Sequence, residues 1–386
     1  MGRRTRLNII LNFIPLKSGG GLQVGLDFLS QIPRYGRMHN WTLFATEGTP
    51  FADVKDARGI TVKLIGRRLA QRLLFEYITC REELEKARAD VVYTQFGPHW
   101  PAAKVKNVVG CAYSNLFYPE IPFWSGLRFY EKAYRTFLDY MRLKRLMVAD
   151  AIIFESETLA KRAVEMMRLP KHKVFCVKPS PSSIVGPGVY HEETEHRCRK
   201  IPEGFRVLLL ANYHKNKNIE LLPGVAKILR DEFGERDIVF VITLSPSLRQ
   251  TRNILKLSEE LGIKDRIYNI GPVPPQGCSE VYRACDAVIL PSRLESFSNN
   301  IAEAWIMKKP LLISDLDWAR DLCGDGALYF RYKDVRDIAK KLFHLKYDSN
   351  LRNRLINGGR KSLEGYPTSK ERFLQYLKII EKTCDS

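Results

Sequence analysis

The chain has 386 residues, of which 45% are hydrophobic and 11% aromatic, and its formal net charge is +19 at pH 7. This length predicts two domains, and the composition excludes disordered, collagen-like and coiled-coil proteins. The longest apolar runs have only the length of buried strands, so we expect no transmembrane helix.

The N-terminus has a basic start at residues 1–6 and an apolar run at 7–14, as a short signal peptide does. Asn8 and Asn12 interrupt the run and no small-residue cleavage site follows, so we interpret it as a first buried strand. The eight cysteines are scattered and form no C-x-x-C pair. This pattern predicts reduced thiols in the cytoplasm and no zinc site.

Short β-branched runs alternate with helical patterns along the whole chain, which predicts an α/β fold with parallel sheets covered by helices on both faces. One series of expected strands lies at 7–13, 41–45, 61–64, 91–94, 108–112, 151–155 and 174–177. A second lies at 206–211, 238–244, 267–270, 287–290 and 311–314, with helices at 219–232 and 279–285. The two series predict two Rossmann-like domains that face each other across a ligand-binding cleft.

The two series are joined by residues 178–188, which are rich in Pro, Ser and Gly, and by a charged stretch at 191–200. This composition is typical of a linker. We therefore expect a first domain at 1–190 and a second at 201–365. We expect the C-terminal helix at 366–386 to pack back on the first domain.

The segment after the strand at 287–290 predicts an anion site. A helix opens there with Ser298 as its N-cap. The free amides of Phe297, Ser298 and Asn299 would point toward the crevice at the end of the strand, where the helix dipole favours an anion. The segment therefore predicts a phosphate cradle.

Two glutamates, Glu295 and Glu303, bracket this cradle. A carboxylate can accept hydrogen bonds from sugar or ribose hydroxyls, whereas phosphates would repel it. We therefore interpret the pair as a sugar-recognition element. The alternative is a solvated loop acid and a charge on a helix surface.

The order of motifs resembles the retaining group 1 glycosyltransferases of GT-B fold. The resemblance rests on Pro291-Ser292, the two glutamates with seven residues between them, the following strand at 311–314 and the Gly-Asp-Gly-Ala-Leu-Tyr-Phe segment at 324–330. It extends to the segments at 19–21, 149–159, 208–222, 271–274 and 279–286.

This resemblance implies a role for each residue of a donor site. It implies that Glu303 binds the ribose of a nucleotide sugar, Glu295 contacts the donor sugar and Lys217 neutralises the diphosphate. The family commonly has an arginine near Asn212, which an asparagine cannot replace. Lys215 is either its substitute or a solvated turn lysine. The implied catalytic residues are Glu295 and Lys217, and the implied donor-binding residues are Glu303, Lys215, Asn212, Ser296, Phe297, Ser298, Asn299 and Val273, the last beside the base.

In the first half, many relatives carry a histidine after the fifth strand, where this chain has Tyr113 and Ser114. His99 either supplies an imidazole on the acceptor side or is a loop histidine without a role. Gly20 and Gly21 would let the backbone approach the donor phosphates or the acceptor, although turn chemistry alone also explains them.

Departure of a nucleoside diphosphate needs its growing negative charge to be stabilised, which Lys217 and the helix N-terminus can do without a metal. Asp315 and Asp317 have D-x-D spacing but follow a strand where the family has no metal site. We therefore expect no metal or cofactor, with a UDP- or GDP-sugar as the substrate. Retention of anomeric configuration is implied by the resemblance alone.

Positive charge is concentrated in the first half: residues 1–200 have a formal charge of +13 and residues 201–386 one of +6. The segment at 122–147 interleaves aromatic, aliphatic and basic residues at near-helical spacing. This pattern predicts peripheral contact with an anionic membrane at its cytoplasmic inner face, and a glycan or lipid-linked acceptor. The alternative is a helix whose aromatic face is buried core.

Three other functions remain as alternatives. Nucleic-acid binding would explain the charge, but the chain has no recognisable binding module and the charge is spread over many helices. An epimerase of GT-B fold would act on the nucleotide sugar without an acceptor. A dehydrogenase would need a G-x-G-x-x-G motif after a first strand, which is absent. The expected function is a glycosyltransferase of surface polysaccharide or glycolipid synthesis.

Overall fold

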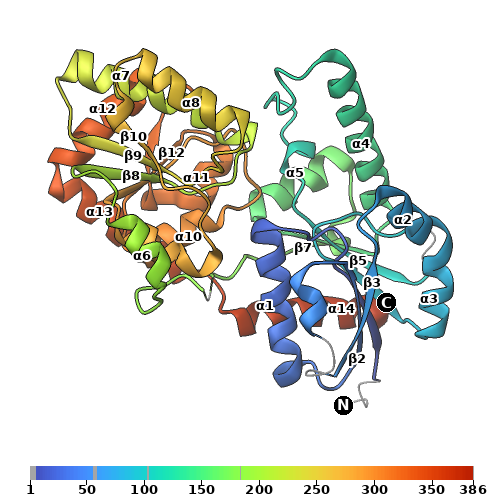
Figure 1. Ribbon diagram of the computed structural model, residues 1–386. Helices are drawn as coiled ribbons and strands as arrows, with labels where there is room; N and C mark the ends of the chain where they lie inside the picture. The colour runs from blue at the N-terminus through green and yellow to red at the C-terminus, as the bar shows by residue number, and fades with distance from the viewer. Residues whose placement is uncertain (1–5, 55–58, 102–103, 183, 386) are drawn as a thin grey trace. The chain divides into compact units, whose positions relative to one another are not determined.

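The computed structural model describes residues 6–54, 59–101, 104–182 and 184–385 (Figure 1). The chain divides into two compact units. Unit 1 comprises Met1–Ser180 and Pro367–Ser386, and unit 2 comprises Pro181–Tyr366. Each unit is built on its own parallel sheet, so the predicted α/β class with two Rossmann-like units is confirmed.

The sheet of unit 1 has the strand order β3-β2-β1-β4-β5-β6-β7. The order reverses between β1 and β4, which is where ligands bind in open parallel sheets. Every strand predicted for this half is present within two residues at each end. The strands are β1 (Asn8–Asn12), β2 (Asn40–Thr46), β3 (Ile60–Ile65), β4 (Val91–Thr94), β5 (Lys106–Cys111), β6 (Ala151–Phe154) and β7 (Val174–Cys176).

The N-terminal apolar run forms the central strand β1, as predicted. The Asn12 amide is buried there and donates a hydrogen bond to Thr94 Oγ1 on β4 over 3.2 Å. The described helices around this sheet are α1 (Gly19–Tyr35), α2 (Leu69–Leu74), the π-helical turn η2 (Phe75–Thr79), α3 (Cys80–Lys86), α4 (Phe129–Met147), α5 (Glu157–Met167) and α14 (Ser369–Asp385).

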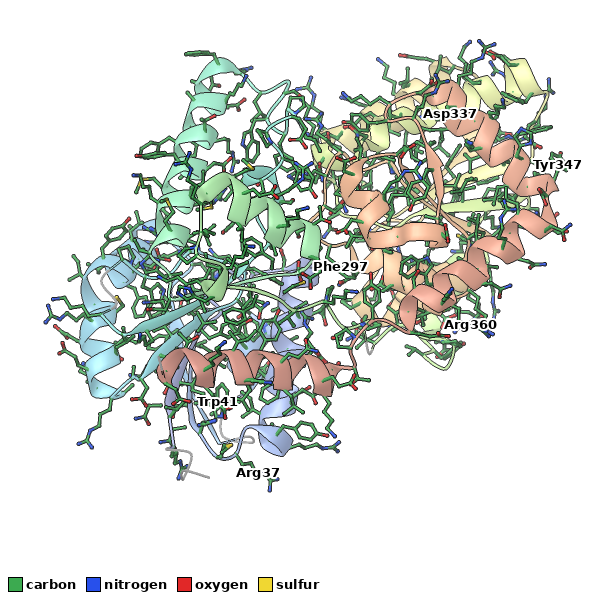
Figure 2. All side chains as sticks on the ribbon, turned by 180° about the vertical axis from the view of Figure 1, so that it is seen from behind. Arg37, Trp41, Phe297, Asp337, Tyr347 and Arg360 are labelled. Carbon is green, nitrogen blue, oxygen red and sulfur yellow. The ribbon has the colours of Figure 1, made fainter. Side chains whose placement is uncertain are left out.

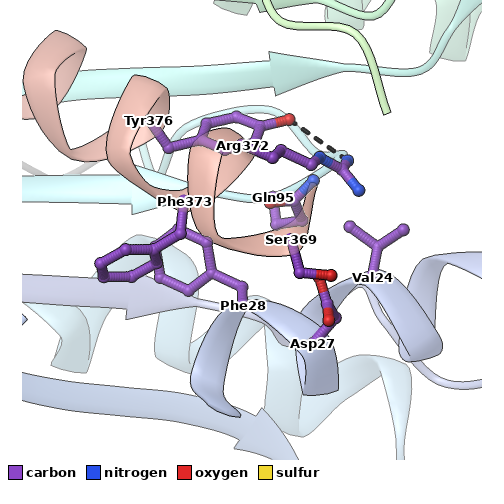
Figure 3. A pocket seen from close by; sticks show the side chains of 8 residues that line it. All are labelled: Val24, Asp27, Phe28, Gln95, Ser369, Arg372, Phe373 and Tyr376. Carbon is purple, nitrogen blue, oxygen red and sulfur yellow. Dashed lines mark hydrogen bonds between the residues drawn. The ribbon is translucent and has the colours of Figure 1, made fainter. Parts of the chain in front are cut away.

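The C-terminal helix α14 completes the core of unit 1. Phe373 packs against Phe28 of α1 with ring centroids 4.9 Å apart, and Tyr376 packs against Tyr93 of β4 at 5.5 Å. Arg372 is buried beside them, with Nη2 3.4 Å from the Tyr376 hydroxyl (Figure 3) and 3.7 Å from Glu155 Oε1. Residues at the end of the chain therefore belong to the first hydrophobic core.

The sheet of unit 2 has the order β10-β9-β8-β11-β12-β13, with helices on both faces (Figure 1). Its strands are β8 (Phe205–Leu209), β9 (Ile238–Ile242), β10 (Ile267–Asn269), β11 (Ala287–Leu290), β12 (Leu311–Ser314) and β13 (Leu328–Phe330). Its described helices are α6 (Glu192–Cys198), α7 (Leu222–Phe233), α8 (Arg249–Glu260), α9 (Cys278–Arg283), α10 (Asn299–Ile306), α11 (Asp317–Cys323), α12 (Val335–Tyr347) and α13 (Ser349–Leu363). The sequence predicted the equally short edge strands β7 and β10 but not β13.

One prediction about the linker is wrong. Residues 191–200 contain α6, and unit 2 begins at Pro181 rather than at Ile201. His191 caps the helix by accepting a hydrogen bond from the amide of Thr194 over 3.3 Å, and acidic residues in the first turn suit the helix dipole. Thr194 and Cys198 are buried, so this charged stretch packs as part of the domain.

Candidate active site

The site predicted in the second half lies at the carboxyl edge of the sheet of unit 2, where β8 and β11 are adjacent. Val207 pairs with Ala287, so the loops that follow the two strands leave the same edge side by side. The strand order reverses between these two strands, as it does in the first sheet. A ligand site is expected at this position in a sheet of this type.

Two asparagines connect the two loops. The carbonyl of Asn216 accepts a hydrogen bond from the Arg293 amide over 2.8 Å, and its side chain both donates to the carbonyl of Leu294 and accepts from the Leu294 amide. Asn218 donates to the carbonyl of Pro291 over 2.7 Å. Asn218 has a φ of +48°, a left-handed conformation that asparagine tolerates better than most residues. The loop after β11 is therefore held in place by the loop after β8.

Lys217 and Glu295, one from each loop, form an ion pair. The Lys217 ammonium lies 2.6 Å from Glu295 Oε1, and the two side chains are 20% and 13% exposed. Two residues that are 78 positions apart and were both predicted as catalytic are thus in direct contact. Asn212 and Lys215 lie on the same loop as Lys217 and are exposed.

The loop after β11 leads into α10. Ser298 takes the N-cap position, as predicted, but its side chain makes no capping hydrogen bond within the described residues. Ser296, Phe297 and Asn299 are half-buried around it. The ring of Phe297, labelled in Figure 2, lies 6.0 Å from that of Tyr366. The Phe297 ring therefore packs against another side chain of unit 2. The predicted anion site involves the backbone amide of Phe297 and not this ring.

Glu303 lies on the second turn of α10 and is only 7% exposed. Its Oε2 accepts a hydrogen bond from the hydroxyl of Tyr282 on α9 over 2.9 Å. Burial raises the pKa of Glu303 to about 7, and the Tyr282 hydrogen bond opposes that rise. The alternative of a solvated helix-surface charge is therefore wrong for Glu303.

Val273 is half-buried in the loop that follows β10. Arg197 of α6 holds this loop, because its Nη2 donates to the carbonyl of Pro272 over 3.0 Å and also to that of Ile270. Sequence reasoning missed Arg197 because it assigned residues 191–200 to the linker. It also missed Asn216, Asn218 and Tyr282, whose side-chain types alone indicate a turn or a core position.

The D-x-D aspartates lie after β12. Both oxygens of Asp315 accept hydrogen bonds from Arg320, over 2.7 and 2.8 Å, and Asp317 begins α11. Within the residues that the structure describes, no three His, Cys, Asp or Glu side chains are grouped as a metal site would need.

The candidate residues of unit 1 occupy three places. Tyr113 and Ser114 follow β5, and the Arg142 guanidinium lies 4.5 Å from the centre of the Tyr113 ring. His99 is buried between β4 and β5, where burial and the nearby Arg145 lower its pKa. The predicted glycines Gly20 and Gly21 form the first turn of α1.

Helix α4 exposes most of its aromatic side chains. Of its residues only Leu146 is buried, and Phe129 is 89% exposed. The alternative of a buried aromatic core face is therefore wrong. None of the described helices is both long and apolar enough to cross a bilayer. The exposed residues, named here the aromatic surface, are Phe129, Tyr130, Tyr134, Phe137 and Tyr140 of α4, with the exposed basic residues Arg128, Lys132 and Lys144.

Two units, each built on a parallel sheet whose strand order reverses, define the class of fold as GT-B. A glycosyltransferase from Rickettsia africae has a TM-score of 0.73 at 15% identity and covers 98% of each chain. HepE from Anabaena, solved in complex with UDP and glucose, has a TM-score of 0.71 at 13% identity over 97% of this chain and 99% of that one.

The sequence of unit 2 is similar to a known family. Residues 192–362 match the family model described as glycosyl transferases group 1. A D-inositol 3-phosphate glycosyltransferase of Nocardia farcinica is 33% identical over 140 residues, which are 35% of this chain and 31% of that protein. The chain thus matches about a third of the length of that curated relative. The predicted resemblance to the group 1 glycosyltransferases is thus confirmed for residues 192–362, and retention of configuration stays a prediction.

Proposed function

We propose that the protein is a retaining glycosyltransferase that moves a sugar from a UDP- or GDP-sugar to a hydroxyl of a glycan or lipid-linked acceptor. One observation carries the proposal: Lys217 and Glu295 pair across the loops after β8 and β11, and Glu303 lies on α10, which the second loop leads into, all inside the segment that matches the group 1 family. A nucleotide sugar has phosphates, which a cation can bind, and hydroxyls, which can donate hydrogen bonds to carboxylates. The site contains both kinds of group.

Each of these groups would bind one part of the donor. Glu303 would accept hydrogen bonds from the ribose hydroxyls, because a buried carboxylate needs donors. Lys217 and the amides at the start of α10 would meet the diphosphate. Glu295 would contact the sugar. In the reaction the bond from the sugar to the diphosphate oxygen breaks, a bond to the acceptor oxygen forms, and the acceptor hydroxyl gives its proton to the departing diphosphate. Lys217 would stabilise the departing charge without needing a metal.

The base and the acceptor are inferred from similar proteins and from the charge of the chain. Because HepE was solved with UDP and glucose, a UDP-sugar is the first donor to test. The relative in Nocardia farcinica is named for an inositol phosphate acceptor. The excess of positive charge in residues 1–200 favours an anionic acceptor for this chain as well. Tyr113, Ser114 and His99 stay candidates for the acceptor side.

Peripheral attachment to the inner face of the cytoplasmic membrane is a further part of the proposal. The aromatic surface of α4 combines rings that partition into the lipid interface with basic residues that attract anionic headgroups. Arg145, near the end of α4, lies over the ring of Tyr77 on η2 at 5.3 Å. Tyr77 and its neighbours Leu74 and Ile78 are also exposed, so α4 contacts a second segment with exposed apolar side chains.

Donor binding is tested by thermal shift and calorimetry with UDP, GDP, ADP, CDP and NAD. We expect one nucleoside diphosphate to raise the melting temperature, and Glu303→Ala to abolish the shift. Glu260→Ala, an exposed glutamate on α8, is the matched control. Incubation of the matching nucleotide sugar with and without acceptor then separates transfer from epimerisation. Tight, salt-sensitive binding to nucleic acid without any nucleotide shift would contradict the proposal.

Membrane attachment is tested by sedimentation with vesicles that contain anionic lipid. Phe129→Ser combined with Phe137→Ser should release the protein, and high salt should weaken binding of the wild type. Leu374→Ser, which removes an exposed apolar side chain from α14 of the same unit, should bind as the wild type does. Equal sedimentation of all three proteins would refute this part.

A further inference from the structure

Tyr282 lies in the segment 279–286 that resembles the family, but none of the roles described above is assigned to it. Tyr282 lies on α9 and is completely buried, and its hydroxyl donates to Glu303 Oε2 over 2.9 Å. Within the described residues Glu303 Oε1 has no hydrogen-bond partner, and the residue keeps 7% of its surface exposed. One carboxylate oxygen is thus held from inside the protein, while the other is left for an outside donor.

The surroundings of this carboxylate contain few ionisable groups. Tyr282 and Cys278, both on α9, are the titratable groups that interact with it. On the other side, α10 packs on α13 through Trp305 and Gly359, and on β12, whose residues Leu311–Ser314 carry no ionisable side chain. Among the described residues, the Tyr282 hydrogen bond is the contact that lowers the pKa of Glu303. The Tyr282 hydroxyl is therefore the group that favours the ionised form.

We infer that Tyr282 is a positioning residue for donor binding: it fixes one oxygen of Glu303 so that the other oxygen receives the ribose, and it keeps the carboxylate in its ionised, accepting form. This inference rests on the proposed function, because it assigns a partner to the residue that would bind the ribose. An ionised carboxylate can accept the Tyr282 hydrogen bond and those of both ribose hydroxyls, whereas a protonated one has fewer free acceptor sites.

The affinity for the nucleotide should therefore depend on pH. Burial raises the pKa of Glu303 to about 7, so below that pH the free protein must lose a proton before it can bind the ribose in this way. Affinity should therefore fall up to about tenfold for each unit of pH below about 7, and level off above it. Loss of the Tyr282 hydrogen bond raises the pKa of Glu303 further. The pH above which the affinity levels off, named here the levelling point, then moves to a higher value.

The test is calorimetric titration of the intact protein with UDP and with GDP between about pH 6 and about pH 9. The nucleotide's own phosphate also titrates, near pH 6. Because glutamine does not titrate, the affinity of Glu303→Gln measures the pH dependence that this phosphate contributes. Relative to that baseline, we expect wild-type affinity to level off near neutral pH and Tyr282→Phe affinity to level off at higher pH. Tyr93→Phe, which removes a hydroxyl from an equally buried tyrosine of unit 1, should keep the wild-type profile.

The outcomes separate this inference from the proposed function. Nucleotide binding with the same levelling point in Tyr282→Phe and wild type would overturn the positioning role alone. Uniformly weaker binding of Tyr282→Phe at every pH would overturn the part of the inference that concerns the ionised form, because the hydroxyl would then have the same effect on both protonation states of Glu303. Absence of binding by the folded wild type would overturn the proposed function and this inference together.

Discussion

Replacement of Glu295 by glutamine tests whether the ion pair with Lys217 competes with the donor. Glutamine keeps the size of the side chain and removes its charge. In the free protein the Lys217 ammonium lies 2.6 Å from Glu295 Oε1. An entering diphosphate must therefore take the ammonium from the carboxylate. We expect bare UDP to bind more tightly to Glu295→Gln than to the wild type, while sugar transfer becomes slower.

The magnitude follows from the distance and the burial. At 2.6 Å the Coulomb attraction is about 6 kcal/mol with an effective dielectric constant of about 20. Most of this is offset by desolvation and by the ordering of two long side chains, which are still 20% and 13% exposed. A charged hydrogen bond in this setting contributes about 1 to 2 kcal/mol, so UDP affinity should rise by roughly five- to thirtyfold.

The assay is calorimetry with UDP beside steady-state kinetics with the matching sugar donor. Lys217→Met should weaken UDP binding, and in the double variant the glutamine should no longer change the affinity. The gain in Glu295→Gln should shrink as salt is added, because part of the pair is exposed. UDP affinity within twofold of the wild type, in a folded Glu295→Gln protein, would refute the competition.

Three further predictions concern the residues that support the site and the first core. Asn216→Ala removes the hydrogen bonds to the loop after β11 and should lower both donor affinity and the free energy of unfolding, the latter by about 1 to 3 kcal/mol in urea titration. Arg372→Ala takes a buried partner from Glu155 and should destabilise unit 1 by about 3 to 5 kcal/mol, whereas Arg372→Met with Glu155→Leu should recover most of the loss. Gly359→Ala would place its Cβ 2.1 Å from Cδ1 of Trp305 and should lower the melting temperature, by an overpacking cost of about 1 to 3 kcal/mol.

The strands could be predicted because each is a short buried run between turn residues. β4, β11 and β12 begin and end where the sequence predicted. α6 could not be predicted in the same way, because three glutamates and two basic residues within seven positions indicate a solvated segment. Only the packing of Thr194 and Cys198 against the rest of unit 2 gives that helix a buried face.

The site was predictable in part. The resemblance indicated Lys217, Glu295 and Glu303, but their spacing along the chain does not reveal that β8 and β11 are neighbours in the sheet. The contact between Lys217 and Glu295 depends on that adjacency. Tyr282 could not be identified, because an aromatic residue in a short helix before a buried strand has the pattern of an ordinary core residue. Its function depends on where the hydroxyl points, and that is a property of the folded chain.

The two carboxylates of the site have opposite kinds of neighbour. Glu295 faces a cation, so its negative charge is compensated before any ligand binds. Glu303 faces a neutral phenol, so its charge is supported only by hydrogen bonds. A diphosphate that takes Lys217 would leave Glu295 without its cation and free to accept hydrogen bonds from the sugar. A ribose would supply Glu303 with the donors that burial denies it. The same ligand would thus remove the cation from Glu295 and supply hydrogen-bond donors to Glu303. Glu295→Gln should therefore change the affinity for bare UDP and for a complete UDP-sugar differently. Glu303→Gln should change both affinities alike.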